Sequence, residues 1–254
     1  MASLQTAERV SRDASDNFVF QRSILAYYEA AKRIAGDVLE IGTGSGYGIE
    51  VIAPHAKRFI TVDKFMAEMG GALPDNVEFR QTVVPPLTFE SESFDFVISF
   101  QVIEHIKDDI EFVREIHRVL RPGGKAIITT PNAPLSLTRN PWHIREYRAD
   151  ELHNLFGVHF DQVEMMSVAG NEQVMAYYER NRQSVERITR WDLLDLQHRL
   201  PRWMLQLPYD ILNRINRRKL LAAAPKATAS IRMEDYFLTD NEEQGFDLFV
   251  IATK

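Results

Sequence analysis

A strand-like run that passes directly into a glycine-rich turn constrains this chain more than any other feature. Residues 37–41 form a short apolar run typical of a buried parallel strand. Glycine then occupies every second position from Gly42 to Gly48, and residues 49–53 have the composition of a helix start. A helix N-terminus presents unpaired N–H groups to an anion, and glycine lets the backbone approach a ligand closely. The stretch therefore predicts a nucleotide-cofactor site.

The following hundred residues repeat the alternation of strand and helix. Four further apolar runs predict strands at residues 59–62, 76–80, 94–100 and 125–130. A helix with one apolar face precedes the break at residues 121–124. Such alternation predicts an α/β fold with a doubly wound, mostly parallel sheet, in which ligands bind beyond the carboxyl ends of the strands. The residues at these ends are Gly42, Asp63, Phe100 and Thr130.

Composition excludes several classes of protein. With 254 residues and 45% hydrophobic content, the chain is long enough for one domain with an elaboration. It contains no apolar run long enough to span a membrane, and its polar N-terminus lacks a secretory h-region. It has no cysteine for a disulfide or a thiolate zinc site, and its net charge of −6 counts against nucleic-acid binding. We expect a soluble cytoplasmic protein that binds no nucleic acid.

The spacing of the glycines separates two kinds of cofactor. A dinucleotide loop, G-x-G-x-x-G, would need glycine where this chain has Tyr47. Glu40 stands beside the turn, where an acid would repel a pyrophosphate but suit a ligand with a cationic amine and a sulfonium. Asp63, at the end of the next strand, is placed to accept both hydroxyls of a ribose. These features favour S-adenosylmethionine over NAD.

A set of short motifs then gives the chain a family resemblance. The motifs are residues 40–46 (EIGTGSG), Asp63, residues 93–99 and 102–106, residues 119–125 and residues 129–132. In this order and spacing the chain resembles the class I S-adenosylmethionine-dependent methyltransferases, of the group that includes ubiquinone-biosynthesis-like enzymes. The resemblance runs from about Gly36 to Asn132 and continues more weakly to the C-terminus. It implies a seven-stranded Rossmann-like sheet whose last strand is antiparallel to the rest.

The resemblance also implies a cofactor site and one departure from the family pattern. The residues expected to contact S-adenosylmethionine are Glu40, Gly42, Thr43, Gly44, Gly46, Asp63, Lys64, Val83, Phe100 and Gln101. Family members often carry an acid after the third strand that binds the adenine amino group. Here Val83 or Val84 takes that position. Apolar contact and backbone groups would then hold the adenine.

Two histidines are candidates for the chemistry of transfer. Methyl transfer is an in-line displacement in which the protein aligns the nucleophile, and a hydroxyl acceptor benefits from a base. His105 and His143 are the candidate bases, and the alternative for His105 is that Glu104-His105 opens a helix. Some quinone-type relatives hold a metal with a Glu-Glu-His set in this region. Gln101 stands where the first glutamate would be, so no metal site is expected.

The segment after the fifth strand is predicted to recognise the acceptor. Residues 133–147 include Trp142, Arg145 and Tyr147 and also contain Pro134 and Pro141, which suits a substrate-binding loop. The alternative for His143 and Arg145 is a loop held by an Arg–carboxylate pair. A helix is also expected within residues 1–36, with Gly36 as its stop. Its Arg22, Tyr27 and Tyr28 either meet the ligand or only pack and pair.

The last third of the chain is predicted to elaborate the core. Residues 1–168 and 245–254 would form the methyltransferase core, and residues 169–244 a mainly helical insertion before the last strand. Within the insertion, apolar residues recur at helical spacing up to Leu194 and again from Leu200, and residues 222–230 suggest a mobile linker. The insertion would be a lid over the acceptor pocket, a homodimer interface, or a basic amphipathic surface on an anionic membrane.

Together these features predict an S-adenosylmethionine-dependent methyltransferase for a small-molecule acceptor, acting by O-methylation. Two alternatives remain. One is an NAD-type oxidoreductase on a similar sheet, against which Tyr47 and Glu40 count. The other is a methyltransferase-like protein that binds without catalysis, against which the glycine turn and Asp63 count.

Overall fold

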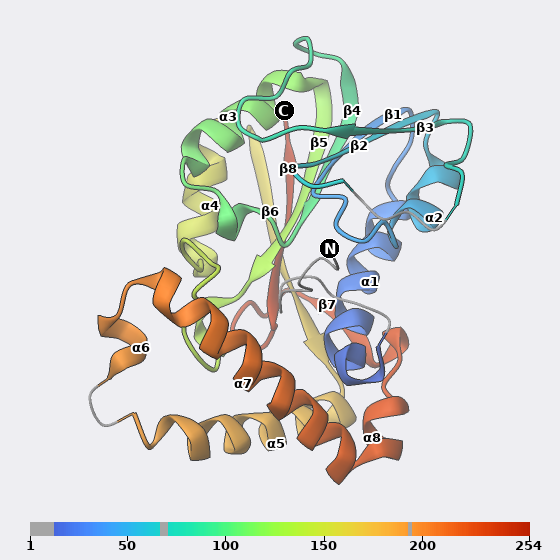
Figure 1. Cartoon of the computed structure of the whole chain (residues 1–254). Helices are drawn as coiled ribbons and strands as arrows, with labels where there is room; N and C mark the ends of the chain where they lie inside the picture. The colour runs from blue at the N-terminus through green and yellow to red at the C-terminus, as the bar shows by residue number, and fades with distance from the viewer. Residues whose placement is uncertain (1–12, 67–70, 193–194) are drawn as a thin grey trace.

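The computed structural model describes residues 13–66, 71–192 and 195–254. These residues form a sheet in the order β3-β2-β1-β4-β5-β8-β6-β7 with helices on both faces (Figure 1). The strands are β1 (Asp37–Ile41), β2 (Arg58–Asp63), β3 (Val77–Gln81), β4 (Phe94–Phe100), β5 (Leu120–Pro131), β6 (Gln162–Gly170), β7 (Tyr236–Thr239) and β8 (Asp247–Thr253). The helices are α1 (Asn17–Ala31), α2 (Ile49–Ile52), α3 (Asp109–Val119), α4 (Ala149–Gly157), α5 (Glu172–Thr189), α6 (Leu196–Arg199), α7 (Arg202–Ala223) and α8 (Pro225–Ala229).

The sheet has the predicted doubly wound, mostly parallel arrangement. Strands β1 to β5 pair in parallel, and β8 runs antiparallel between β5 and β6. The sheet of the described residues has eight strands, whereas the family pattern implied seven. The additional strand β7 comes from the insertion and pairs antiparallel with the end of β6. Its residues Tyr-Phe-Leu-Thr favour a strand, and the buried Tyr236 hydroxyl donates to the Phe18 carbonyl at 2.7 Å.

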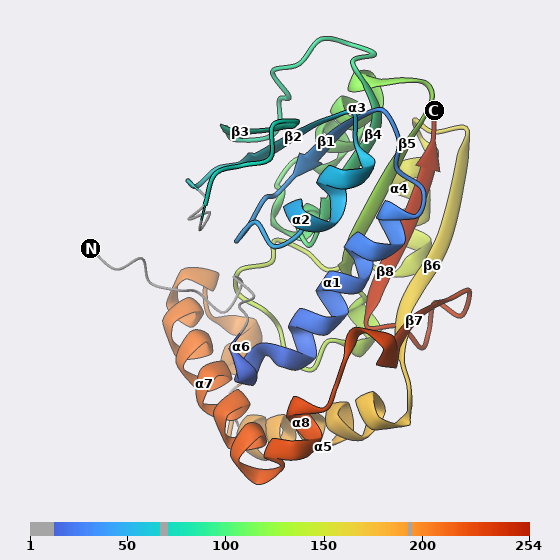
Figure 2. The ribbon, with the colours of Figure 1, turned by 90° about the vertical axis from the view of Figure 1, so that its right-hand side faces the viewer.

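Side chains that alternate along each strand divide the core into two layers. Val38 packs toward α1 and α2, whereas its neighbour Leu39 packs toward α3 and α4. Both residues are fully buried. Figure 2, turned by 90°, shows α1 and α2 on the near face of the sheet. Because both faces are covered, the open edge for a ligand lies at the carboxyl ends of the parallel strands.

The N-terminal helix ends earlier than expected. Helix α1 stops at Ala31, and Gly36 instead begins the turn into β1 with φ +74°. A Cβ at Gly36 would lie 2.2 Å from Asp95 Oδ2, so close packing against Asp95 also requires glycine here. Of the residues expected to meet the ligand or pair, Arg22 forms an ion pair with buried Asp247 at 2.8 Å, and Tyr28 is exposed.

The insertion lies across the carboxyl ends of the parallel strands. Figures 1 and 2 both show α5, α6 and α7 on that side of the sheet. The expected linker at residues 222–230 is wrong, because these residues end α7 and form α8. Alanine has the highest helix propensity, and proline suits a first helical turn, as Pro225 shows. Leu194, counted among the helical positions, lies outside the described residues.

Two further predictions about the insertion stay untested by the fold. Trp203 and Leu207 are exposed on α7, as either a dimer interface or a membrane-binding surface would require. Both alternatives remain predictions. The division into a core and an insertion at residues 169–244 also remains one, and β7 shows that the insertion contributes to the sheet. Among the helices of the described residues, none combines the length and the apolar character that crossing a membrane requires.

Candidate active site

The glycine turn has the backbone geometry that the sequence suggested. Gly42, Gly44 and Gly46 all have positive φ, at +98°, +55° and +77°. A Cβ at Gly42 would lie 2.3 Å from Val102 Cγ2, and φ is +98°, so any other residue here would be strained and would displace Val102. A Cβ at Gly44 would meet no atom within 4 Å. The turn therefore packs tightly on one side and faces open space on the other, which leaves room for a ligand against its backbone.

A buried hydroxyl network supports the turn from below. The Tyr27 hydroxyl donates to Glu40 Oε1 at 2.8 Å, and the Thr61 hydroxyl donates to Glu40 Oε2. Thr43 donates in turn to Thr61 at 2.5 Å. Burial raises the pKa of Glu40 to about 7, against the opposing effect of the two hydroxyl bonds. Tyr27 thus contributes to the site through Glu40.

Asp63 connects the end of β2 to the turn. Its Oδ2 accepts the Gly44 N–H at 2.9 Å, and its Oδ1 accepts the Phe65 N–H at 2.9 Å. A carboxylate oxygen can accept a second hydrogen bond, so the geometry is compatible with ribose hydroxyls. The Phe100 ring contacts Tyr27 edge-on at 4.7 Å between centroids. The remaining predicted contacts lie at the rim, where Val83 is exposed and the Lys64 carbonyl accepts the Gln81 amide at 3.0 Å.

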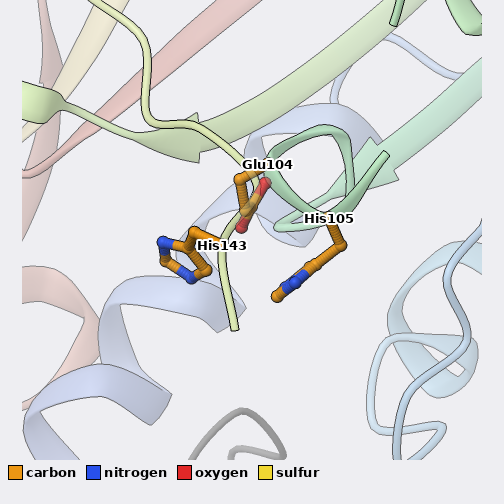
Figure 3. A group of neighbouring side chains, drawn as sticks. All are labelled: Glu104, His105 and His143. Atoms are coloured by element: carbon orange, nitrogen blue, oxygen red, sulfur yellow. The ribbon is translucent and has the colours of Figure 1, made fainter. Parts of the chain in front are cut away.

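Beyond β4, three side chains from two segments meet in one cluster. Glu104 and His105 belong to a single 3₁₀ turn, Ile103–His105, and His143 comes from the loop after β5. Figure 3 shows the Glu104 carboxylate between the two imidazoles. One oxygen or nitrogen from each residue lies within 4.8 Å of the others, and the imidazole centroids are 5.0 Å apart. The structure therefore brings together the two predicted histidines, with a carboxylate beside them.

Hydrogen bonds define the protonation of His143. Its Nδ1 lies 2.7 Å from Glu146 Oε1, and its Nε2 lies 2.8 Å from Asn140 Nδ2. The Asn140 amide is oriented by its oxygen, which accepts the Trp142 N–H at 3.0 Å, so its nitrogen donates to His143. His143 consequently carries its proton on Nδ1 and donates it to Glu146.

His105 is held by the same loop. Its Nδ1 lies 3.0 Å from the Trp142 carbonyl oxygen, which can only accept. His105 is therefore protonated on Nδ1, and its Nε2 is the basic nitrogen. The backbone adds a second tie, since the Ile144 N–H donates to the Glu104 carbonyl at 2.7 Å. The alternative was that Glu104-His105 opens the helix and hydrogen-bonds backbone. The pair does not open α3, which Asp108 caps, but His105 does bond to a backbone carbonyl.

Sequence reasoning assigned no role to Glu104, the third member of the cluster. Its side chain is buried, and the Thr130 hydroxyl donates to its Oε2 at 3.0 Å. Burial raises the pKa of Glu104, an effect that His105 and His143 partly oppose. A buried carboxylate of raised pKa is a better proton acceptor than an exposed one. The available signal was the Glu-His pair directly after a strand whose end faces the ligand edge.

The cluster could also ligate a metal, since a glutamate and two histidines are common ligands. Both ring nitrogens of His143 and the Nδ1 of His105 already have protein partners. A metal on His143 would have to displace Asn140 or Glu146. Acid–base chemistry needs no such displacement, and the expectation that no metal is held stays a prediction.

The acceptor loop is anchored at several points. Arg145 Nη1 and the Tyr147 hydroxyl both donate to Asp109 Oδ2, at 2.7 and 2.8 Å. The indole Nε1 of Trp142 donates to Asp210 of α7 at 3.1 Å. The Arg–carboxylate pair considered as an alternative is thus present. Trp142, Arg145 and Tyr147 are absent from the described lining of the cavity beside the cluster, and their substrate-binding role stays a prediction.

That cavity has a volume of about 730 Å³ and lies between the cluster and the insertion. Gln101, Glu104 and His143 line its inner end. Phe18 and Arg22 of α1 line one side, and residues of α5 and α7 lie opposite. Ligand sites typically measure about 300–1,000 Å³. The cavity therefore has the size of a ligand site, and two members of the Glu104–His105–His143 cluster line it.

Comparison with known families agrees with this arrangement. Residues 14–227 match the model of a family described as a methyltransferase domain. The chain belongs to this methyltransferase family. The match extends over α1, the sheet as far as β6, and most of the insertion.

Curated methyltransferases resemble the chain over part of its length. A probable S-adenosylmethionine-dependent methyltransferase of Mycolicibacterium smegmatis is 41% identical over 155 residues, which are 56% of this chain and 58% of that protein. The ubiquinone biosynthesis O-methyltransferase of Ruegeria pomeroyi is 33% identical over 113 residues, 41% of this chain and 42% of that enzyme. The matched part is thus less than two thirds of these relatives.

Solved methyltransferases share the fold at low sequence identity. A Thermotoga maritima S-adenosylmethionine-dependent methyltransferase, described as a possible histamine N-methyltransferase, gives a TM-score of 0.58 at 17% identity and covers 97% of both chains. Phosphoethanolamine N-methyltransferase 2 of Haemonchus contortus, solved with S-adenosylmethionine, gives 0.54 at 20% identity over 93% of this chain and 52% of that one. These similarities show that the sheet and its helices have the class I methyltransferase fold.

Proposed function

We propose that this protein transfers a methyl group from S-adenosylmethionine to an oxygen of a small-molecule acceptor. The observation that carries the proposal is the position of Glu104, His105 and His143. Glu104 and His143 line the cavity together with Gln101, which directly follows β4, and β4 pairs with β1, the strand that leads into the glycine turn. A hydroxyl acceptor must lose a proton during transfer, and this cluster can take it.

The residues around the turn fit the cofactor. S-adenosylmethionine supplies a methyl group already activated by its sulfonium. Asp63 would hold the ribose hydroxyls, and Glu40 would face the charge of the ammonium group. Gly44 leaves open space against the turn where a side chain would otherwise stand. Burial raises the pKa of Glu40 to about 7, and a cation beside the carboxyl favours its ionised form. The ammonium group of the cofactor would be that cation.

The protein's own contribution is alignment, water exclusion and proton transfer. Glu104 is the proposed proton acceptor, since it is buried and lines the cavity. His143 donates to Glu146 and His105 donates to the Trp142 carbonyl, so both rings are held in place. Both imidazoles can stabilise the charge on Glu104, and Nε2 of His105 can accept the proton from it. Helices α5 and α7 cover the cavity and reduce access of water to the acceptor.

Calorimetry and a turnover screen test the proposal. We expect S-adenosylmethionine and S-adenosylhomocysteine to bind and NAD not to bind. Formation of S-adenosylhomocysteine from a library of phenols, alcohols, carboxylic acids and amines then tests the acceptor atom. Binding of NAD but neither sulfur ligand would support the oxidoreductase alternative. Transfer to amines alone would refute O-methylation, and cofactor binding without any transfer would favour a non-catalytic role.

A further inference from the structure

Helix α7 of the insertion forms one wall of the cavity, and most of its side chains are not buried by other parts of the protein. Helix α7 is 22 residues long and is described throughout, yet Asn216 is its one buried side chain. Apolar residues of α7, among them Met204, Leu205 and Leu212, line the cavity. Isolated helices draw most of their stability from packing an apolar face. Here that face borders empty space instead of protein.

The opposite wall has the same character. Val185 and Ile188 of α5 line the cavity across from α7, and Leu135 and Leu137 of the loop after β5 close one end. Polar contacts join the two helices at one point, where Ser184 donates to Asn216 at 2.6 Å and Asn216 donates to Asn181 at 2.7 Å. The two helices thus meet at Asn216, and apolar residues of both line the cavity.

Polar contacts hold α6 and α7 to the rest of the protein at two places. Arg217 of α7 pairs with Asp16 at 2.7 Å beside α1. At the other end, Arg139 donates to the Gln197 carbonyl at 3.0 Å, and Arg202 donates to the Ile144 carbonyl at 2.5 Å. The space between the helices is therefore a built cavity whose span is set by these ties.

The charged side chains of the described lining are already engaged by protein. Glu146 bonds to His143, Arg22 to Asp247, Arg217 to Asp16, Arg139 to two carbonyls, Asp192 to the N–H groups of Leu196 and Gln197, and Glu104 to Thr130. Arg22 and Arg217 already face carboxylates, and Arg139 is held by two carbonyls, so a phosphate or carboxylate of a ligand would have to compete with these contacts for a countercharge. Transfer of an unpaired charge to such an environment is costly.

We propose that the acceptor is an uncharged amphipathic hydroxy compound with a large apolar body. Its hydroxyl lies at the Glu104–His143 end, and its apolar body lies between α5 and α7. The body would cover the apolar face that α7 now presents to the cavity. This inference rests on the proposed methyl transfer to oxygen, of which it specifies the substrate class.

Equilibrium binding tests the substrate class separately from turnover. A neutral reporter dye, N-phenylnaphthylamine, is displaced from the full-length protein by para-alkylphenols with side chains from methyl to octyl. We expect the dissociation constant to fall by about fourfold per methylene until the cavity is filled. Octyl phosphate should bind more weakly than octylphenol. A dissociation constant that ignores chain length, or tighter binding of the phosphate, would overturn the inference.

A matched pair of variants locates the bound body. Leu205→Trp fills the cavity and should weaken octylphenol binding by about tenfold or more, whereas Leu207→Trp, two residues away and exposed, should not. Val185→Trp provides a second blocking variant if Leu205→Trp unfolds, and S-adenosylmethionine affinity and the unfolding midpoint report the fold. Equal weakening by Leu207→Trp would contradict the inference. Length-dependent binding without methyl transfer would refute O-methylation of phenols and leave the apolar class standing.

Discussion

The proposed site has a cofactor half, around the glycine turn, and an acceptor half, around the cavity, and the two are assembled in different ways. In the cofactor half, Glu40 bonds to Tyr27 and Thr61, which are 13 and 21 residues away, and Gly44 bonds to Asp63, 19 residues away. In the acceptor half, Trp142 reaches Asp210 across 68 residues, and Arg217 reaches Asp16 across 201. The first half is made by one strand–turn–helix unit and its neighbour. The second exists only after the insertion has folded over the sheet.

This difference indicates where each property of the proposed methyltransferase is determined. The proposed cofactor site consists of the backbone at three glycines and two acids, and such a unit can be kept while the rest of the chain varies. The acceptor cavity depends instead on side chains from α1, the loop after β5 and the insertion. We therefore expect changes in the acceptor half to alter turnover and selectivity, and changes in the cofactor half to alter cofactor affinity and stability.

The largest expected effect is the loss of turnover on replacing Glu104. Glu104→Gln keeps the size of the side chain but removes the proton acceptor, so kcat should fall by about 10²–10⁴-fold. S-adenosylmethionine affinity should be unchanged, because the glycine turn is not altered. The measurement is S-adenosylhomocysteine formation with an acceptor from the screen, with exposed Glu90→Gln as the control.

The histidine variants complete this test. His143→Ala and His105→Ala should each lower kcat if the imidazoles orient or discharge Glu104. Wild-type turnover in all three variants would show that no base operates in the cluster. Turnover would then not depend on the acceptor half in the way proposed.

The next effect concerns the backbone of the cofactor half. Gly42→Ala places a Cβ against Val102 in a φ region that alanine adopts only under strain. We expect the free energy of unfolding to fall by about 3 kcal/mol and S-adenosylmethionine affinity to fall with it. Urea unfolding and calorimetry measure both, and Gly71→Ala, where a Cβ meets no atom within 4 Å, is the control. Equal stability of the two variants would contradict the tight packing of the turn.

How much the sequence predicted follows from the same contrast. The strand–turn–helix unit, the position of Asp63 at the end of β2 and the alternating core depend on local periodicity and glycine spacing, and the structure confirms them. The role of Asp63 in cofactor binding stays a prediction. The extra strand β7 and the helical residues 222–230 were not, because β7 forms only by pairing with β6 and α8 packs beside α7. Glu104 was missed for a related reason. Its burial comes from Thr130 and the loop of His143, which are distant in sequence.

A pH-dependent effect should be specific to the cofactor half. Because burial raises the pKa of Glu40 to about 7, folding binds its proton more tightly than the unfolded chain does. The resulting stability is complete below pH about 4.5 and is lost as pH rises through about 7, up to about 3 kcal/mol. We expect urea unfolding to show this loss for the wild type and not for Glu40→Gln. If the free energy of unfolding changes with pH in the same way in both proteins, a group other than Glu40 is responsible.

Calorimetry adds a second readout for the same group. Binding of S-adenosylmethionine near pH 6.5 should release a proton, since its ammonium group favours ionised Glu40. The release is measured by repeating the titration in buffers of different ionisation enthalpy. Methylthioadenosine, which lacks the ammonium group, should bind without release. Equal proton release by both ligands would show that the ammonium group does not act on Glu40.

The smallest expected effect decides between two roles for Arg145. Its side chain is half exposed, and its ion pair with Asp109 is joined by the buried Tyr147 hydroxyl. A screened pair of this kind is worth at most about 1 kcal/mol, so Arg145→Ala should lower the free energy of unfolding by no more than that. If Arg145 only anchors the loop, KM for the acceptor should match that of the exposed control Arg148→Ala. A tenfold rise in KM at unchanged stability, about 1.4 kcal/mol, would instead make Arg145 a substrate-binding residue and extend the acceptor half beyond the cavity.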